Sequence, residues 1–242
     1  MAVDDAAHVG QSDAGAFELV QEMALHFSTA IFDMDGTLLG TERLAVEALT
    51  LAFAEHDVSV PPLALEHVIG LAGNDTRAYL AQFSPAGVDA EQSLRRGSEL
   101  IKARIAEHGM PVKSGVLNLL AYLHARGTAL GVATSTRAAT AMDHLQHAAI
   151  AHYFGTVIGG DDVENAKPHP EIYLRVLARL GASAADAIAI EDSDHGIKSA
   201  YAAGLRVIYV PDIKPLPATV RELVHREYAT LDELHAELVQ VS

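Results

Sequence analysis

The chain has 242 residues, half of them hydrophobic and a fifth charged, and its formal net charge is −15. This length suits one large α/β domain or a core with a small inserted domain. The acidic balance argues against long-range attraction to nucleic acid or to an anionic membrane surface. The absence of cysteine excludes disulfides, thiolate metal ligands and thiol nucleophiles.

Residues 1–27 are expected to form an N-terminal extension. They contain no basic region followed by a long apolar run, so they do not resemble a signal peptide, and no later segment is apolar enough to span a membrane. We therefore expect a cytoplasmic protein.

Five short apolar or β-branched runs follow along the chain, and most of them lead into a helical pattern. They are residues 29–32, 129–133, 156–158, 187–190 and 206–210. This alternation predicts an α/β fold with a doubly wound parallel sheet covered by helices. In such sheets ligands bind beyond the carboxyl ends of the strands.

The first run ends in Phe32-Asp33-Met34-Asp35-Gly36-Thr37, where an extended segment breaks into a glycine turn. Residues two apart in an extended segment point to the same side, so both carboxylates can address one reacting group. One carboxylate could attack phosphorus while the other transfers a proton. Two such close carboxylates repel unless a cation or a shared proton separates them, and we expect Mg²⁺.

Nearly a hundred residues separate the first two runs, which is too long for a simple crossover. Leu44, Ala48, Leu51 and Ala52 are expected to share the buried face of one helix; a second helix can begin at Asn74, and Asp89 can cap a third that runs toward His108. We place an inserted helical domain at residues 43–111 and the core domain at residues 28–42 and 112–242.

Three further polar features follow later strands. Thr134 and Ser135 come after the second run and precede a helix, Lys167 lies between alanine and proline after the third, and Glu191-Asp192 ends the fourth. Taken singly, each has an ordinary explanation: a helix cap, a helix start and a solvated acidic turn. Together, hydroxyls and a lysine can hold phosphate oxygens, and the acidic pair can bind a hard cation.

The order of these four motifs resembles the haloacid dehalogenase superfamily of phosphohydrolases. The similarity covers roughly residues 28–235 and is greatest to the branch with a helical cap after the first motif, which includes β-phosphoglucomutase-like and phosphoglycolate phosphatase-like enzymes. It implies a Rossmann-like core and a helical cap. We expect the protein to be a monomer or a homodimer.

This resemblance also implies the roles of the site residues. Asp33 would be the nucleophile that forms an aspartyl-phosphate and a Mg²⁺ ligand, and Asp35 the general acid and base, with its carbonyl on the metal. Thr134 and Lys167 would hold the transferring phosphoryl oxygens. The acidic pair completes the metal site, with Asp192 as a ligand and Glu191 as a ligand or an outer carboxylate.

The chain departs from the pattern of many relatives beyond the first motif. Gly40 and Ala45 stand where those relatives carry Asp and His around a retained hydroxyl residue, here Thr41. The missing His weakens a mutase interpretation and favours water as the phosphoryl acceptor. Ser135, Arg137, Thr41 and Arg77 are candidate substrate-binding residues; Arg77 follows a segment, residues 70–76, that is similar to the substrate-facing loop of such caps.

The favoured function is a Mg²⁺-dependent phosphatase of a small phosphorylated metabolite, such as a sugar phosphate, with a sugar phosphomutase as the nearest alternative. A phosphoaspartate receiver has comparable residues, but there the acidic pair comes first, whereas Glu191-Asp192 comes last. A dehalogenase would not need the acidic metal cluster. The sequence does not specify which metabolite is the substrate.

Overall fold

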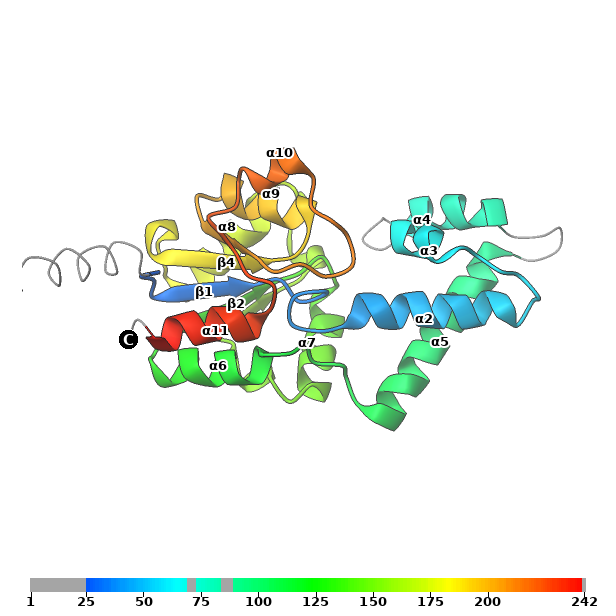
Figure 1. Cartoon of the computed structure of the whole chain (residues 1–242), viewed down its shortest axis with the longest axis horizontal. Coiled ribbons are helices and arrows are strands. Elements are labelled where there is room, and N and C mark those ends of the chain that lie inside the picture. Colours follow the sequence, from blue (N-terminus) through cyan, green and yellow to red (C-terminus); the bar gives the residue numbers. More distant parts are fainter. Residues whose placement is uncertain (1–24, 69–72, 84–88, 241–242) are drawn as a thin grey trace, which may run out of the picture.

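A six-stranded parallel sheet forms the centre of the larger part of the molecule (Figure 1). The computed structural model describes residues 25–68, 73–83 and 89–240. The strands lie in the order β3-β2-β1-β4-β5-β6. Their bounds are β1 Thr29–Phe32, β2 Ala129–Ala133, β3 Thr156–Ile158, β4 Ala187–Glu191, β5 Arg206–Tyr209 and β6 Arg226–Glu227.

The chain first adds β2 and β3 on one side of β1 and then crosses to the other side to form β4, β5 and β6. Phe32 at the end of β1 pairs in register with Val132 of β2 and with Ile190 of β4. Residues that follow these three strands therefore emerge at one edge of the sheet. The reversal of strand order at β1 makes this edge the expected binding crevice of a doubly wound fold, as the sequence predicted.

Helices cover both faces of the sheet, which explains why β1 is buried along its whole length. Ala30 and Phe32 pack into the core on the side of α6 (Val116–Ala125) and α11 (Leu231–Gln240), whereas Ile31 packs into the core on the side of α8 (Glu171–Leu180) and α9 (Asp194–Ala202). Figure 1 shows these two helical layers above and below the sheet. The helices of this part are α6 Val116–Ala125, α7 Ala138–His147, α8 Glu171–Leu180, α9 Asp194–Ala202, α10 Ala218–Arg221 and α11 Leu231–Gln240, with short 3-10 turns η2 Ala151–Tyr153, η3 Gly160–Asp162 and η4 Ala184–Asp186.

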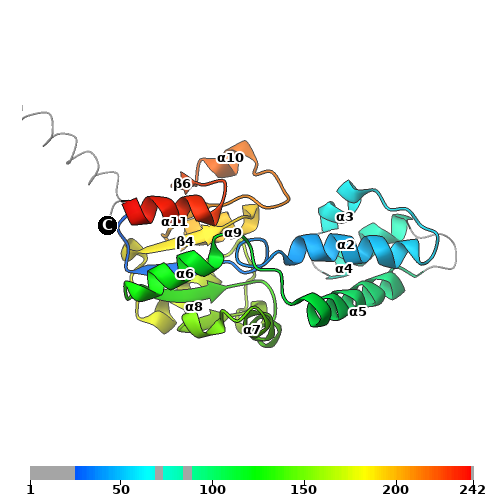
Figure 2. The same ribbon diagram turned by 60° about the horizontal axis from the view of Figure 1, so that its bottom comes forward.

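The helices from α2 to α5, which follow β1 in the chain, form a separate group beside the sheet (Figure 2). These elements are α2 Thr41–Ala54, α3 Pro62–Val68, α4 Gly73–Leu80, η1 Ala81–Phe83 and α5 Ala90–His108. They bury a small core of their own, which includes Phe53, Leu65 and Leu80. Asp89 caps α5 by accepting a hydrogen bond from the backbone N–H of Glu91, as expected from the sequence.

The predicted buried face of α2 was wrong at one position. Leu44, Ala48 and Ala52 are buried, but Leu51 is 57% exposed. Leu49, two residues before Leu51, is buried instead. The buried stripe of α2 is thus rotated relative to the prediction because α5 and α3 pack on this side of the helix.

Two linkers connect the helical group to the sheet, and they pair with each other. Leu39 in the outgoing linker forms an antiparallel bridge with Val112 in the returning one, and Gly40 N–H donates to the Pro111 carbonyl at 2.8 Å. The start of α2 is therefore fixed close to the acidic turn.

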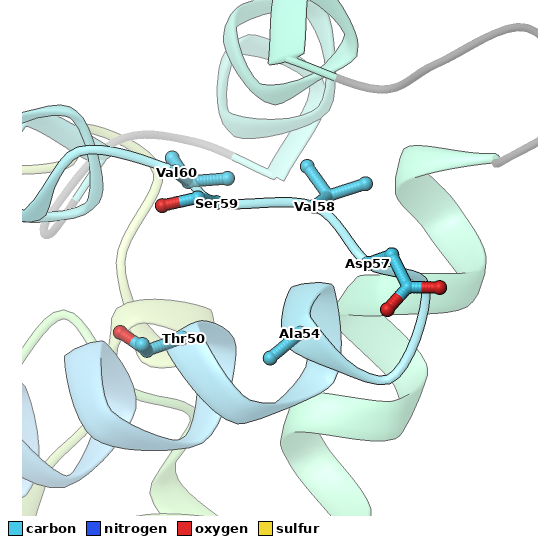
Figure 3. Close-up of a pocket in the computed structure, with 6 residues that line it drawn as sticks. All are labelled: Thr50, Ala54, Asp57, Val58, Ser59 and Val60. Carbon is cyan, nitrogen blue, oxygen red and sulfur yellow. The ribbon is translucent and has the colours of Figure 1, made fainter.

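A small hollow lies at the far end of α2, away from this turn (Figure 3). Its lining is Thr50, Ala54, Asp57, Val58, Ser59 and Val60. This lining holds one carboxylate and no cationic side chain, so it offers nothing that would bind a phosphate. Within the described ranges, no helix is both long enough and apolar enough to cross a bilayer.

Candidate active site

The centre of the site is a buried lysine between two carboxylates. Lys167, in the loop between η3 and α8, donates from Nζ to Asp33 Oδ1 and to Glu191 Oε1, each at 2.6 Å. A third donation goes to the Ala133 carbonyl at 3.0 Å. The Lys167 side chain is only 4% exposed, so these charge-assisted bonds are poorly screened by solvent. The ends of β1, β2 and β4 thus meet at one ammonium group.

Glu191 has both of its oxygens committed to protein donors. Oε1 accepts from Lys167 and from the Tyr173 hydroxyl at 2.8 Å. Oε2 accepts from the backbone N–H groups of Asp192 and Ser193 and from the Ser193 hydroxyl. A Cβ at Gly196 would lie 1.7 Å from Glu191 Oε1, so the carboxylate fits against bare backbone. Glu191 therefore anchors Lys167 and the start of α9.

Asp35 is held by hydroxyl groups from two directions. Its Oδ1 accepts from Thr41 Oγ1 at 2.6 Å, at the first residue of α2. Its Oδ2 accepts from Thr136 Oγ1 at 2.7 Å and from Thr134 Oγ1 at 3.3 Å, both beyond the end of β2. The Asp35 carboxylate is thereby fixed in a position that bridges the core and the first helix of the helical group.

Asp192 lies directly against the turn that carries Asp35. Gly36 has a φ of +86°, and a Cβ there would lie 2.3 Å from Asp192 Oδ2. The buried Thr37 hydroxyl donates to Asp192 Oδ1 at 2.9 Å. The glycine of the turn is therefore needed both for its left-handed backbone and for the close approach of this carboxylate.

The carboxylates of this site repel one another in a region of low solvent access. Burial raises the pKa of Asp33 well above its usual range; Lys167 opposes this shift, and Glu191 and Asp35 reinforce it. Burial likewise raises the pKa of Asp192, and Glu191 and Asp33 add to the effect. Burial tends to lower the pKa of Lys167, but the Asp33 and Glu191 carboxylates outweigh it and raise that pKa. One ammonium does not balance three acidic groups, so the site favours a further proton or a cation.

A second group of carboxylates adjoins Asp192. Glu42 of α2 and Asp212, which follows β5, each place a carboxylate oxygen within 4.8 Å of one another and of Asp192. Burial raises the pKa of Glu42 to about 7, and the Asp212 carboxylate contributes in the same direction. Lys113 forms an ion pair with Asp212 at 2.8 Å. The acidic surroundings of Asp192 thus extend toward the start of α2.

The remaining predicted residues lie around this centre without joining it. Ser135 is exposed beyond β2. The Arg137 side chain is 82% exposed and pairs with Asp161 at 3.5 Å. In the helical group, Arg77 donates to Glu91 at 2.6 Å. Residues 70–72 of the expected substrate-facing loop lie outside the described residues.

Several residues of the site were not singled out from the sequence. Thr136 was not among the predicted residues, and its spacing of two from Thr134 is the signal that could have placed it on the same side. Tyr173 and Thr37 offered no comparable signal because a buried tyrosine or threonine is an ordinary core residue. Lys113 and Asp212 lie far apart in the sequence and outside any motif.

This site combines the strand order, the paired acidic turn and the buried lysine of a hydrolase fold. A comparison of sequences identifies the family. A profile of the haloacid dehalogenase-like hydrolase family matches residues 30–210. The chain belongs to this family.

Curated relatives and solved structures agree with this assignment. The chain is 31% identical over 179 residues to a phosphorylated carbohydrates phosphatase of Thermotoga maritima, covering 74% of this chain and 82% of the relative. It is 33% identical over 195 residues to phosphoglycolate phosphatase of Salmonella typhimurium, covering 72% and 77%. A crystal structure from Thermotoga maritima, provisionally assigned as a β-phosphoglucomutase, matches with a TM-score of 0.76 and 26% identity, over 89% of this chain and 100% of that chain.

Proposed function

We propose that the protein is a Mg²⁺-dependent phosphatase that hydrolyses a small phosphorylated metabolite, such as a sugar phosphate, through an aspartyl-phosphate on Asp33. The observation that carries the proposal is the buried ion pair between Lys167 and Asp33, at 2.6 Å. Two residues after Asp33, the Asp35 carboxylate accepts a hydrogen bond from a hydroxyl group. The names of curated relatives support a phosphatase, because one acts on phosphorylated carbohydrates and another on phosphoglycolate.

The proposed reaction has two displacements at phosphorus. In the first, an oxygen of Asp33 forms a bond to phosphorus while the ester bond breaks, and Asp35 gives a proton to the departing alkoxide oxygen. In the second, Asp35 accepts a proton from water as the water oxygen attacks the aspartyl-phosphate. Inorganic phosphate leaves and Asp33 is regenerated. Lys167 neutralises charge on the transferring oxygens in both steps.

The residues present fit a magnesium ion. Asp33 and Asp192 are oxygen donors suited to a hard cation, and the bare backbone at Gly36 lets Asp192 approach the turn closely. Burial and mutual repulsion raise the pKa of both carboxylates, which a bound cation would offset. We assign Asp33, Asp192 and the Asp35 carbonyl as ligands and Glu191 as an outer carboxylate. The ion supplies charge neutralisation for phosphoryl transfer.

We assign residues 43–111 as a cap that closes over the substrate. Support comes from Thr41, which begins α2 and donates a hydrogen bond to Asp35. Movement of this helix would therefore shift the carboxylate of the proposed acid and base. A closing cap excludes bulk water and admits only small substrates. Arg77, Arg137, Ser135 and Thr41 are the proposed substrate contacts in that closed form.

The proposed function is tested with a panel of phosphorylated metabolites, each assayed for released phosphate with Mg²⁺ and with EDTA. Asp33→Asn keeps the shape of the side chain but removes the nucleophile, and we expect turnover to fall by at least about a thousandfold. Asp143→Asn, at an exposed carboxylate of α7 that pairs with His147, is a matched control. Full turnover in the Asp33→Asn enzyme would overturn the proposed nucleophile, and activity that survives EDTA would overturn the metal requirement.

A sugar phosphomutase is the second candidate, supported by the structural similarity to the Thermotoga maritima protein. It shares the core residues, but Ala45 stands where mutase relatives use a His side chain near the site. Incubation with a hexose 1-phosphate and a bisphosphate primer separates the two functions. We expect free inorganic phosphate; accumulation of the isomerised sugar phosphate would instead establish the mutase.

A further inference from the structure

We propose that Lys113 is a positioning residue for the metal-binding edge of the site and that it acts through the turn at Gly36 without touching substrate. Lys113 belongs to the linker that returns from α5 to α6. This inference rests on the phosphatase function proposed above, since it concerns how that site is held together.

The Lys113 ammonium has three oxygen acceptors, which matches its three N–H groups. It donates to the Gly36 carbonyl and, at 2.8 Å, to Asp212 Oδ1. The third acceptor is the Pro211 carbonyl at 3.5 Å. The Lys113 side chain is 19% exposed and that of Asp212 only 3%. One partly buried cation therefore ties together the turn after β1, the returning linker and the segment after β5.

The backbone of the linker fixes where this ammonium lies. Lys113 N–H donates to the Leu38 carbonyl at 3.0 Å, and the preceding Val112 forms a bridge with Leu39. Gly36 N–H in turn donates to the Leu39 carbonyl at 2.8 Å. Because the linker and the turn share this register, the side chain of Lys113 meets the Gly36 carbonyl from a fixed position.

The contact reaches Asp192 through a single peptide unit. The Gly36 carbonyl that Lys113 binds belongs to the peptide leading into Thr37, whose hydroxyl donates to Asp192 Oδ1. The same Gly36 leaves the space against which Asp192 Oδ2 lies. Rotation of this peptide would therefore displace both features that orient the Asp192 carboxylate. Lys113 opposes that rotation.

If Lys113 acted only through its charge, its removal would strengthen the binding of Mg²⁺, whereas a positioning role predicts weaker binding. The direction of the change in affinity therefore tests the proposal. Asp212 Oδ2 is buried without a hydrogen-bond partner among the described residues, and oxygens of Glu42, Asp192 and Asp212 lie within 4.8 Å of one another. Removing a cation from beside these acids would remove its Coulomb repulsion of a divalent ion, so the acids would bind that ion more tightly. Removing a positioning contact would weaken it.

The test compares Lys113→Met with the wild type by calorimetric titration of Mg²⁺ into the whole protein without substrate. We expect Mg²⁺ to bind about tenfold more weakly and kcat to fall about tenfold with KM within twofold, as for the loss of one charge-assisted hydrogen bond. Lys102→Met, on the exposed side of α5, is the matched control and should match the wild type.

Mg²⁺ binding in Lys113→Met that is unchanged or tighter would overturn the proposal. If that variant does not fold, Lys113→Gln carries the same sign test, because it also removes the charge and its shorter side chain withdraws the donor. Weakening by threefold or more supports the proposal, and anything less overturns it. A wild type that releases no phosphate from any substrate would refute the proposed function separately, while the titration would still decide the role of Lys113.

Discussion

At Gly36, the backbone conformation of the turn and the position of a site carboxylate depend on each other. Its φ of +86° disfavours any side chain, and the nearest atom to an added Cβ is Asp192 Oδ2 at 2.3 Å. For Gly36→Ala we expect kcat/KM to fall by at least about a hundredfold, because a shift of about 1 Å in a positioned group can cost that much. The measurement is phosphate release at saturating Mg²⁺.

Gly127→Ala is a matched control for this prediction. Gly127 also has a positive φ, +72°, but nothing lies within 4 Å of an added Cβ. It should lose about 1 kcal/mol of unfolding free energy, measured with urea, and keep its activity. Equal activity losses in both variants would show that the backbone cost, and not the contact with Asp192, is responsible.

At the scale of a whole element, Glu171 connects α8 to the loop that leads to the site. In the first turn of α8, its carboxylate accepts from the backbone N–H groups of Glu164 and Asn165, each at 3.0 Å, and from Arg175 at 2.8 Å. The hydrogen bond from Glu164 N–H leads the causes that lower the pKa of Glu171 to about 2. The helix thus holds the loop that leads to Lys167.

The sign of the resulting pH dependence follows from that lowered pKa. The ionised Glu171 stabilises the folded state fully above its ordinary pKa of 4.5, and this contribution is lost as the pH falls toward about 2. Glu171→Gln should therefore be less stable than the wild type at pH 7, and the difference should shrink between pH 4.5 and pH 2. Urea unfolding at several pH values measures it.

Glu164→Gln is the control for charge in the same loop, because it removes one carboxylate without removing the acceptor at Glu171. It should have the stability of the wild type throughout this pH range. If the loss of stability in Glu171→Gln stays constant down to pH 2, this result would contradict the assigned hydrogen bonds.

At the scale of elements, the apolar strands were predictable from the sequence, whereas a polar edge strand was not. The five apolar runs coincide with β1 to β5 to within a residue. The sixth strand, Arg226–Glu227, has no apolar pattern because it lies at the edge of the sheet. The exposure of Leu51 depends on packing between helices, which periodicity alone does not fix.

At the scale of the whole molecule, the topology determines how much of the site could be foreseen. Asp33 and Lys167 are 134 positions apart, yet both follow strands, so the parallel sheet brings them to one edge. Lys113 and Asp212 are 99 positions apart and follow no shared rule of this kind. Their contact depends on the path of a linker and of a loop, which no motif in the sequence marks.

The net charge of −15 leads to a prediction about the molecule as a whole. A phosphorylated substrate is an anion, so the distant field of the protein repels it and only local groups such as Lys167 attract it. Added salt screens the distant repulsion more than contacts inside a buried site, because the Debye length is about 10 Å at 0.1 M. Between 50 and 250 mM NaCl, kcat/KM should therefore rise, by less than about threefold.

The measurement uses p-nitrophenyl phosphate with Mg²⁺ kept saturating at each salt concentration, and KCl in place of NaCl separates screening from an effect of one ion. A protein that captured its substrate on an extended basic surface would behave in the opposite way, with kcat/KM falling steeply as salt is added. A fall of tenfold or more would therefore contradict local capture by the few buried cations at the sheet edge. It would direct attention to exposed cations such as Arg137, whose side chain is 82% exposed at the start of α7.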